Sequence, residues 1–165
     1  MKTVKRRRKS NQTDYMKRLK LLKSSKPRIV FRKTNKYVIA QYITSNETID
    51  KIEIGTNSKQ LLKYGWSEKF KGSLKSIPAS YLTGLLLGKK ILKEKKEHPI
   101  LDFGMIKGIH GTKIFAFMKG VIDAGIKLKH SKEIFPSEDK IAGKNLKDDF
   151  SKDFEKIKSK IENEK

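Results

Sequence analysis

The sequence contains no cysteine, so disulfide bonds and thiolate-ligated zinc or iron–sulfur sites are excluded. Long apolar runs are missing too, because the longest one, around residues 85–87, is far too short to cross a bilayer. The basic residues at the start of the chain are not followed by an apolar segment, which argues against a secretory signal. We therefore expect neither a disulfide framework nor a membrane-spanning segment.

Acidic residues are scarce as well. The 165 residues include 40 Lys and Arg but only 18 Asp and Glu, which gives a formal net charge of +22. This excess is far larger than solubility requires, and it predicts a polyanionic partner. Hydrophobic residues make up 36% of the chain, which is enough for the core of one domain. A wholly disordered basic protein is therefore disfavoured.

The positive charge is concentrated near the N-terminus. Residues 1–36 contain 15 Lys and Arg and a single acid, Asp14, whereas residues 137–165 are neutral overall. The same segment holds all six arginines, namely Arg6, Arg7, Arg8, Arg18, Arg28 and Arg32. A guanidinium group engages phosphate bidentately, whereas an ammonium group acts as a mobile point charge. We expect the arginine-bearing segment to contact nucleic acid in fixed geometry and the later lysines to supply a diffuse field, although genome composition explains scattered lysines equally well.

The N-terminal third predicts an arm, a helix and a β-meander. Residues 1–12 lack apolar periodicity and are expected to be disordered in the free protein. Thr13 is the expected cap of a basic amphipathic helix that ends at Lys26-Pro27, with apolar residues at 15, 16, 19 and 22 on one face. A membrane-surface role is the rival interpretation of such a helix.

Two strand-like runs, RIVFRKT and YVIAQYIT, flank Asn35-Lys36, and a third run continues to residue 55. Alternation places Arg28 and Arg32 on one face of the first strand and Phe31 on the other, where a core position is favoured. Basic and aromatic residues interleave in this region, a pattern that favours structured RNA as the ligand.

The rest of the chain predicts helices over a mixed sheet. A helix should run from Pro78 to about residue 97, with Gly84 and Gly88 in contact with the sheet. The apolar run ILDFGMI is expected to form a central strand, and a helix should lie between Thr112 and Gly125. A short strand could follow over residues 126–129. The element order is that of an α/β fold with right-handed crossovers.

The C-terminal segment has apolar residues at helical spacing, which need a partner, either the domain itself or another protein. These residues are Leu146, Phe150, Phe154, Ile157 and Ile161.

Motifs for catalysis and cofactor binding are weak. The histidines His98, His110 and His130 show no metal-ligand spacing, and the glycine-containing runs miss the spacing of phosphate-binding and dinucleotide-binding loops. Asp102 could serve a nuclease-like metal site, but such a site needs converging acids, and the first strand offers none. We expect no catalytic residue, no metal and no cofactor. A metal-dependent nuclease or RNA-processing factor remains the alternative.

Several long motifs, in order from about Lys5 to Leu146, resemble the archaeal and eukaryotic type of the large-subunit ribosomal protein eighteen family, which binds 5S rRNA. The motifs are KRLKLLKSSKPRIVFRKTNKYVIAQ, KYGW, IPASYLTGLLLGKK, ILDFGMIKG, FAFMKGVIDAGI and FPSEDKIAG. The resemblance implies a three-layer α/β/α mixed sheet related to the ribonuclease H-like motif. Charge and residue pattern together lead us to expect a basic RNA-binding arm and short helix (1–27), an α/β core domain (28–136) and a C-terminal helical extension (137–165).

The resemblance further implies a cytoplasmic, non-enzymatic constituent of the large ribosomal subunit. It would bind 5S rRNA and help attach it to 23S rRNA in the central protuberance, beside the ribosomal protein five family of the large subunit. No membrane, small-molecule substrate or homo-oligomer is expected.

The turn 107–113 departs from the family pattern, which leaves its contact with RNA open. Elsewhere, matching motifs imply a set of residues that would face the RNA. The RNA-facing residues would be Lys5, Arg6, Arg7, Arg8, Lys9, Tyr15, Lys17, Arg18, Lys26, Arg28, Arg32, Thr34, Asn35, Lys36 and Gln41.

Overall fold

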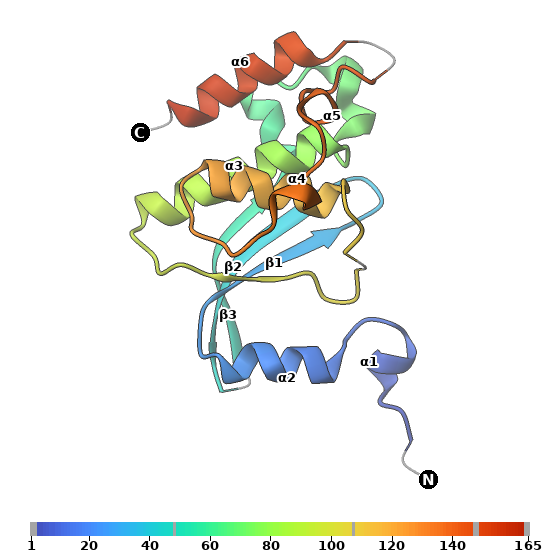
Figure 1. Ribbon diagram of the computed structural model, residues 1–165, viewed down its shortest axis with the longest axis vertical. Coiled ribbons are helices and arrows are strands. Elements are labelled where there is room, and N and C mark those ends of the chain that lie inside the picture. The colour runs from blue at the N-terminus through green and yellow to red at the C-terminus, as the bar shows by residue number, and fades with distance from the viewer. Residues whose placement is uncertain (1–2, 48, 107, 147–148, 164–165) are drawn as a thin grey trace.

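The computed structural model describes residues 3–47, 49–106, 108–146 and 149–163. Four strands form one mixed sheet in the order β3-β2-β1-β4 (Figure 1). They are β1 (Arg28–Lys33), β2 (Val38–Asn46), β3 (Ile49–Asn57) and β4 (Ile100–Asp102). The first three strands are antiparallel neighbours, as the predicted meander requires, and β4 runs parallel to β1. The pairing of β2 with β3 is irregular at Tyr42/Ile43, where the register shifts.

Strand β4 corrects the prediction of a central strand. It is three residues long and lies at the edge of the sheet. Only the first three residues of the apolar run form the strand, which ends at Asp102. Oδ1 of Asp102 accepts a hydrogen bond of 2.8 Å from the backbone N–H of Gly104. Gly104 has a φ of 58°, so the chain turns away from the sheet there. The run is also only partly buried, since Ile100 and Leu101 are half-buried and Ile106 is 36% exposed.

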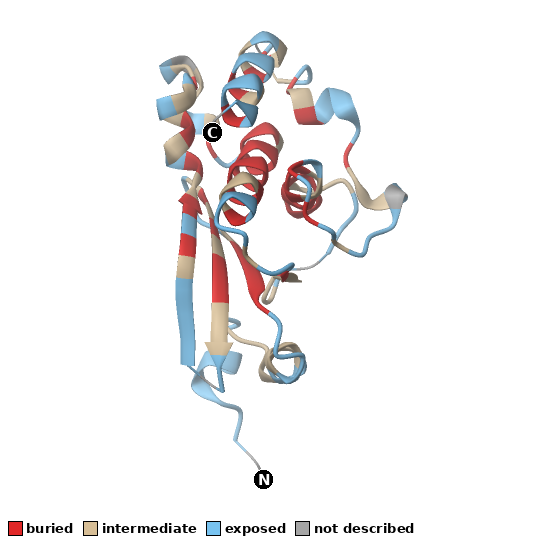
Figure 2. Ribbon diagram, turned by 90° about the vertical axis from the view of Figure 1, so that its left-hand side faces the viewer, coloured by how far each residue is buried: buried red, intermediate tan, exposed pale blue. Residues whose placement is uncertain are grey.

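Two helices, α3 (Ile77–Lys93) and α4 (Lys113–Asp123), cover one face of the sheet (Figures 1 and 2). Helix α4 begins after Thr112, and Gly125 follows its end with a φ of 111°, as the sequence predicts. The glycines of α3 do not contact the sheet as expected. A Cβ at Gly84 would overlap the carbonyl oxygen of Phe117, and one at Gly88 would overlap Cβ of Ala124. Both glycines therefore serve the close packing of α3 on α4.

The core between these helices and the sheet is continuous. Phe31 on β1 is 1% exposed, and its ring centroid lies 5.0 Å from that of Phe117 on α4. The core position favoured for Phe31 is therefore confirmed. Tyr42 on β2 and Ile54 on β3 extend the same cluster across the sheet.

A second cluster fills the other side of α3. It involves the short helical segments η1 (Ser58–Tyr64), η2 (Glu68–Ser73) and α5 (Glu138–Ala142), together with the C-terminal helix α6 (Ser151–Glu162). The ring of Phe150 lies 4.4 Å from that of Trp66, and Phe154, Ile157 and Ile161 are buried. The C-terminal apolar stripe therefore packs on the protein's own domain. Residues 126–129, by contrast, form no strand, and the next element is the short segment η3 (Lys132–Ile134).

The N-terminal helices α1 (Arg6–Lys9) and α2 (Tyr15–Lys23) lie on the side of the sheet opposite α3 and α4 (Figure 1). The arm was expected to be disordered, but it includes α1. Asp14, and not Thr13, caps α2 by accepting hydrogen bonds from the N–H groups of Met16 and Lys17. The described residues contain no helix that is both long and apolar enough to traverse a bilayer.

Candidate nucleic-acid interface

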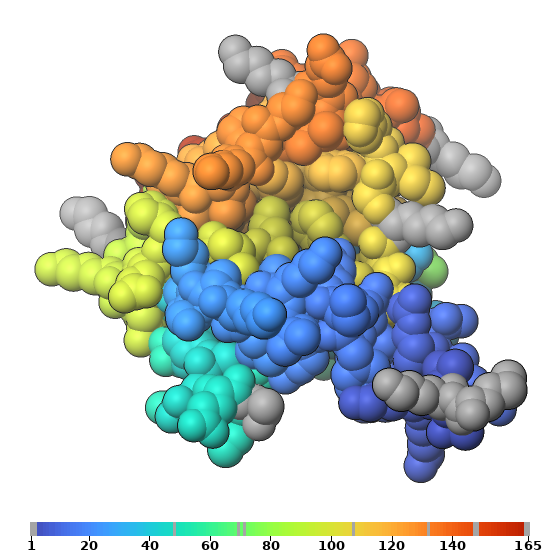
Figure 3. All heavy atoms as spheres, turned by 60° about the horizontal axis from the view of Figure 1, so that its bottom comes forward, coloured from blue at the N-terminus to red at the C-terminus, as the bar shows by residue number. Residues whose placement is uncertain are grey.

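Helix α1 presents a compact set of cations. Its residues Arg6 to Lys9 are all exposed. Lys5, just before the helix, places its Nζ 4.6 Å from the centroid of the Tyr15 ring at the start of α2. Figure 3 shows the N-terminal residues and α2 side by side along one continuous face of the molecule. The predicted arm and helix residues are therefore brought together in space.

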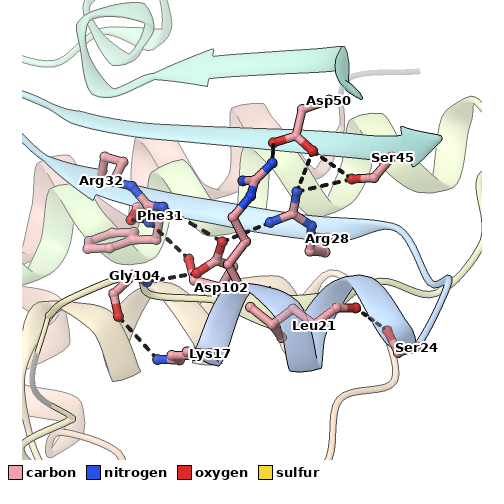
Figure 4. Close-up of polar contacts among 11 residues, drawn as sticks. Lys17, Leu21, Ser24, Arg28, Phe31, Arg32, Ser45, Asp50, Asp102 and Gly104 are labelled. Carbon is pink, nitrogen blue, oxygen red and sulfur yellow. Dashed lines mark hydrogen bonds and ion pairs between the residues drawn. The ribbon is translucent and has the colours of Figure 1, made fainter. Parts of the chain in front are cut away.

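Helix α2 is held on the sheet by polar contacts. Nη2 of Arg18 lies 2.9 Å from Oδ2 of Asp50 on β3, and Nζ of Lys17 donates to the backbone carbonyl of Gly104 at 3.2 Å (Figure 4). No residue of α2 is buried, and Met16 and Leu19 point to solvent. The apolar face of this helix is therefore partly exposed, and Lys17 and Arg18 of its basic face make the polar contacts.

Arg28, one of the predicted RNA contacts, is buried in the structure. Its side chain is 1% exposed, and it contacts partners on the other three strands (Figure 4). Its Nη2 donates to Ser45 on β2 at 3.0 Å and to Oδ1 of Asp50 on β3 at 2.8 Å, while Nη1 donates to Oδ2 of Asp102 on β4 at 3.0 Å. These partners enclose the guanidinium group, and we expect Arg28 to influence RNA binding through them.

The two carboxylates that hold Arg28 also hold two surface arginines. Asp50 pairs with Arg18, and Oδ2 of Asp102 lies 3.7 Å from Nη2 of Arg32. Nη1 of Arg32 also donates to the carbonyl of Phe31 at 2.7 Å. Arg18, Asp50, Arg28, Asp102 and Arg32 thus form an alternating series, which we call the arginine–aspartate ladder. Its two ends are the exposed members, since the side chains of Arg18 and Arg32 are 34% and 43% exposed.

The surroundings of Asp50 favour its ionised form. Burial raises the pKa of Asp50, but hydrogen bonds from Ser45, Arg18 and Arg28, together with the charge of Arg28, outweigh it and lower the pKa overall. By residue type the ladder has three Arg and two Asp, a formal charge of +1. The two arginines at its ends are the more exposed cations.

A small polar cavity of about 130 Å³ joins the ladder to the arm. Its walls include Arg7, Arg18 and Arg32, which come from α1, α2 and β1. Arg7 is held there by a hydrogen bond of 3.0 Å from its Nε to Oγ1 of Thr13, and the Arg32 guanidinium lies 3.1 Å from the position that a Cβ on Gly104 would take. Lys17 of α2 also lines the cavity, so four of the predicted RNA-facing residues converge on one site.

Other predicted residues lie farther along the sheet. Thr34, Asn35 and Lys36 are exposed in the turn after β1, where Oγ1 of Thr34 donates to the carbonyl of Tyr37 at 2.9 Å. Gln41 on β2 is half-buried and pairs with Val30 on β1. Lys26 is exposed before β1, at the opposite end of that strand from the turn, and lines a separate cavity.

Sequence reasoning missed the acids that organise the site. Asp14 caps α2 and lies 3.4 Å from Arg8, while Asp50 and Asp102 hold the ladder. One signal was available for Asp14, because the single acid of a strongly basic segment is a natural partner for its arginines. Asp102, considered above as a metal ligand, is instead paired with Arg28. Over the parts of the chain that the structure describes, no three His, Asp or Glu side chains are grouped to hold a metal ion.

Comparison with known proteins matches this chain to large-subunit ribosomal proteins each time. A family model described as "Ribosomal large subunit proteins 60S L5, and 50S L18" matches residues 1–99. The chain is 46% identical over 141 residues to the "Large ribosomal subunit protein uL18" of Korarchaeum cryptofilum, a match that covers 86% of this chain and 70% of that protein. Proteins of the same description from Methanospirillum hungatei and Methanoregula boonei are 39% and 38% identical over the same share of this chain, and 78% and 79% of their lengths are covered.

Proposed function

Because the chain belongs to the uL18 family of large-subunit ribosomal proteins, we propose that it binds 5S rRNA with the face formed by the arm, α2 and the ladder. As a member of this family, it is a structural constituent of the cytoplasmic ribosome and not an enzyme. The proposal adds the RNA species and the surface. It also includes attachment of 5S rRNA to 23S rRNA in the central protuberance, beside the ribosomal protein five family.

The observation that carries this proposal is the convergence of Arg7, Arg18 and Arg32 on one polar cavity. Guanidinium groups bind phosphate through paired N–H donors, and such pairs are strong when the donors are already oriented. Asp50 and Asp102 orient Arg18 and Arg32, so less side-chain freedom is lost when RNA binds. The site therefore suits a backbone phosphate of a folded RNA.

The remaining predicted residues extend this surface on both sides. Exposed cations of α1 and Lys26 would contact further phosphates, and the turn Thr34 to Lys36 offers a hydroxyl, an amide and an ammonium group. Tyr15 supplies an aromatic ring at the start of α2, which suits stacking on an unpaired base. Arg28 takes part only indirectly, because it holds the two aspartates.

The test is binding of a 5S rRNA transcript to the full chain, measured by filter retention at fixed salt. Arg18→Lys and Arg32→Lys keep the charge but remove the planar donor pair, and each should cost about 1 kcal/mol, roughly fivefold in Kd. Lys152→Gln is the matched control, since this exposed residue lies on α6, far from the ladder. Unchanged affinity of both arginine variants would reject fixed guanidinium contacts. Equal affinity for an unrelated RNA of the same length would reject 5S rRNA as the specific ligand.

A further inference from the structure

A second surface lies on the other face of β1, beside the start of α4. It is a groove of about 550 Å³ with walls that include Ile77, Ile106, Ile109 and Ile114. Ile109 is 62% exposed and Ile106 is 36% exposed. Single exposed apolar side chains are common on protein surfaces, but two on the wall of one groove form a patch that a partner would cover.

The rim of this groove carries cations without partners. Lys33 and Lys113 line it, and Lys75 lies close enough to act on Lys113 electrostatically. Burial lowers the pKa of Lys113, and the positive charges of Lys33 and Lys75 lower it further. Within the described part of the chain, none of the three makes an ion pair or a side-chain hydrogen bond, whereas Lys96 and Lys144 are each paired with an acid. An anion placed here would relieve the mutual repulsion.

We propose that this groove binds an extended segment of a neighbouring protein in which an aliphatic side chain is flanked by Asp or Glu. The aliphatic side chain would fill the space between the isoleucines, and the carboxylates would pair with Lys33 and Lys113. The inference goes beyond RNA binding, because Lys33 alternates with Arg32 along β1 and therefore points away from the ladder.

The chemistry of the groove disfavours RNA as the occupant. Base recognition needs an exposed ring or guanidinium plane for stacking and free donors or acceptors for the base edge. Phe31 borders the groove but is 1% exposed, and the hydroxyl of Thr112 already donates to the carbonyl of Ile109 at 2.7 Å. All arginines of the chain lie among the first 36 residues, and none lines this groove.

The experiment uses the full chain assembled into large ribosomal subunits. A photoreactive benzoylphenylalanine replaces Ile109, the purified subunits are irradiated, and the cross-linked residues are identified by mass spectrometry. The expected result is a cross-link to one segment of another ribosomal protein, next to an aliphatic residue with Asp or Glu close in sequence. The cross-link should disappear when Lys33→Glu and Lys113→Glu are combined. It should persist with the control pair Lys95→Glu and Lys152→Glu, which reverses two exposed charges elsewhere.

Several outcomes would overturn the inference. They are a cross-link to rRNA, no cross-link in subunits that contain the protein, or a cross-link that the charge reversal leaves unchanged. A milder pair, Lys33→Gln with Lys113→Gln, separates loss of recognition from loss of folding, since it should weaken the cross-link in subunits that retain the protein. Binding of isolated 5S rRNA should be the same for this pair and the wild type, which keeps this test distinct from that of RNA binding.

Discussion

Arg28 and Asp50 form an ion pair of 2.8 Å that reaches from β1 over β2 to β3. With Ser45 on β2 and Asp102 on β4 also bonded to this guanidinium group, a single side chain connects all four strands. The buried cation is stabilised only because two carboxylates face it.

Removing this cation should destabilise the fold. Arg28→Met leaves the buried Asp102 with only the longer contact to Arg32, and the free energy of unfolding should fall by about 3–5 kcal/mol, measured by urea denaturation. Arg32→Met is the matched control, because its side chain is 43% exposed and water screens its pair, so it should cost less than about 1 kcal/mol. An Arg28→Met protein of normal stability that no longer binds RNA would show that Arg28 contacts RNA directly.

Acid should weaken the ladder in a defined range of pH. The folded protein lowers the pKa of Asp50 below its ordinary value of 3.8, so its stabilising effect is complete above that value and is lost as pH falls through the folded-state pKa. Urea midpoints measured between about pH 5 and pH 2 should therefore fall less steeply in Asp50→Asn than in the wild type. Asp139→Asn on α5, where the carboxylate is exposed, serves as the control. Identical slopes for Asp50→Asn and wild type would contradict the assigned pairing.

The contact between α3 and α4 should tolerate no added methyl group at its glycines. A Cβ on Gly120 would overlap the carbonyl oxygen of Tyr81, so Gly120→Ala should force the helices apart and cost about 1–3 kcal/mol or more. Gly55 on β3 has open space around the position of a Cβ, and Gly55→Ala should stay within about 0.5 kcal/mol of wild type. Thermal unfolding of the two variants compares them directly, and equal midpoints would refute the close approach.

The C-terminal helix should be part of the cooperative unit. Phe150 is buried against Trp66, the single tryptophan, so Phe150→Ala should cost about 3–5 kcal/mol and shift tryptophan emission to the red. Ile49→Ala removes an apolar side chain that is already exposed and should change neither quantity appreciably. Separate unfolding transitions for the helix and the sheet would argue against a shared core.

The arm should determine much of the salt dependence of RNA binding. Replacing Arg6, Arg7 and Arg8 by Gln should lower the slope of log K against log salt by ~0.7 to 0.9 for each phosphate that the arm no longer neutralises. Lys152→Gln, Lys156→Gln and Lys160→Gln together remove three charges from α6 and should leave the slope unchanged. A smaller slope in the α6 variant would mean that charge acts as a uniform field.

Local patterns predicted the parts of the fold that local forces determine. Strand alternation identified the meander and the core position of Phe31, and Thr112 and Gly125 marked the two ends of α4, although the Thr112 side chain makes no capping hydrogen bond. The charge distribution identified a polyanion as the partner. Each of these depends on residues close together in the chain.

What failed depended on contacts distant in sequence. Arg28 occupies an outward position of an alternating strand and so looked exposed, but Asp50 and Asp102, 22 and 74 residues away, enclose it. Helix α2 contacts the rest of the domain through the polar side chains of Lys17 and Arg18, and a pattern of apolar residues cannot predict such contacts. The glycines of α3 contact α4, and nothing in a single helix specifies which neighbour approaches it.

The irregular pairing at Tyr42/Ile43 has a consequence for the protein before it joins a ribosome. Strand β3 forms one edge of the sheet, and an open edge invites a second copy to add its own strand. The register shift interrupts the pairing of β3 with β2, and irregularities of this kind bend a strand. Asp50, Lys51 and Glu53 also place charges among the isoleucines of this edge. Both features oppose sheet-to-sheet aggregation, so a newly made copy should remain dispersed until it meets its RNA.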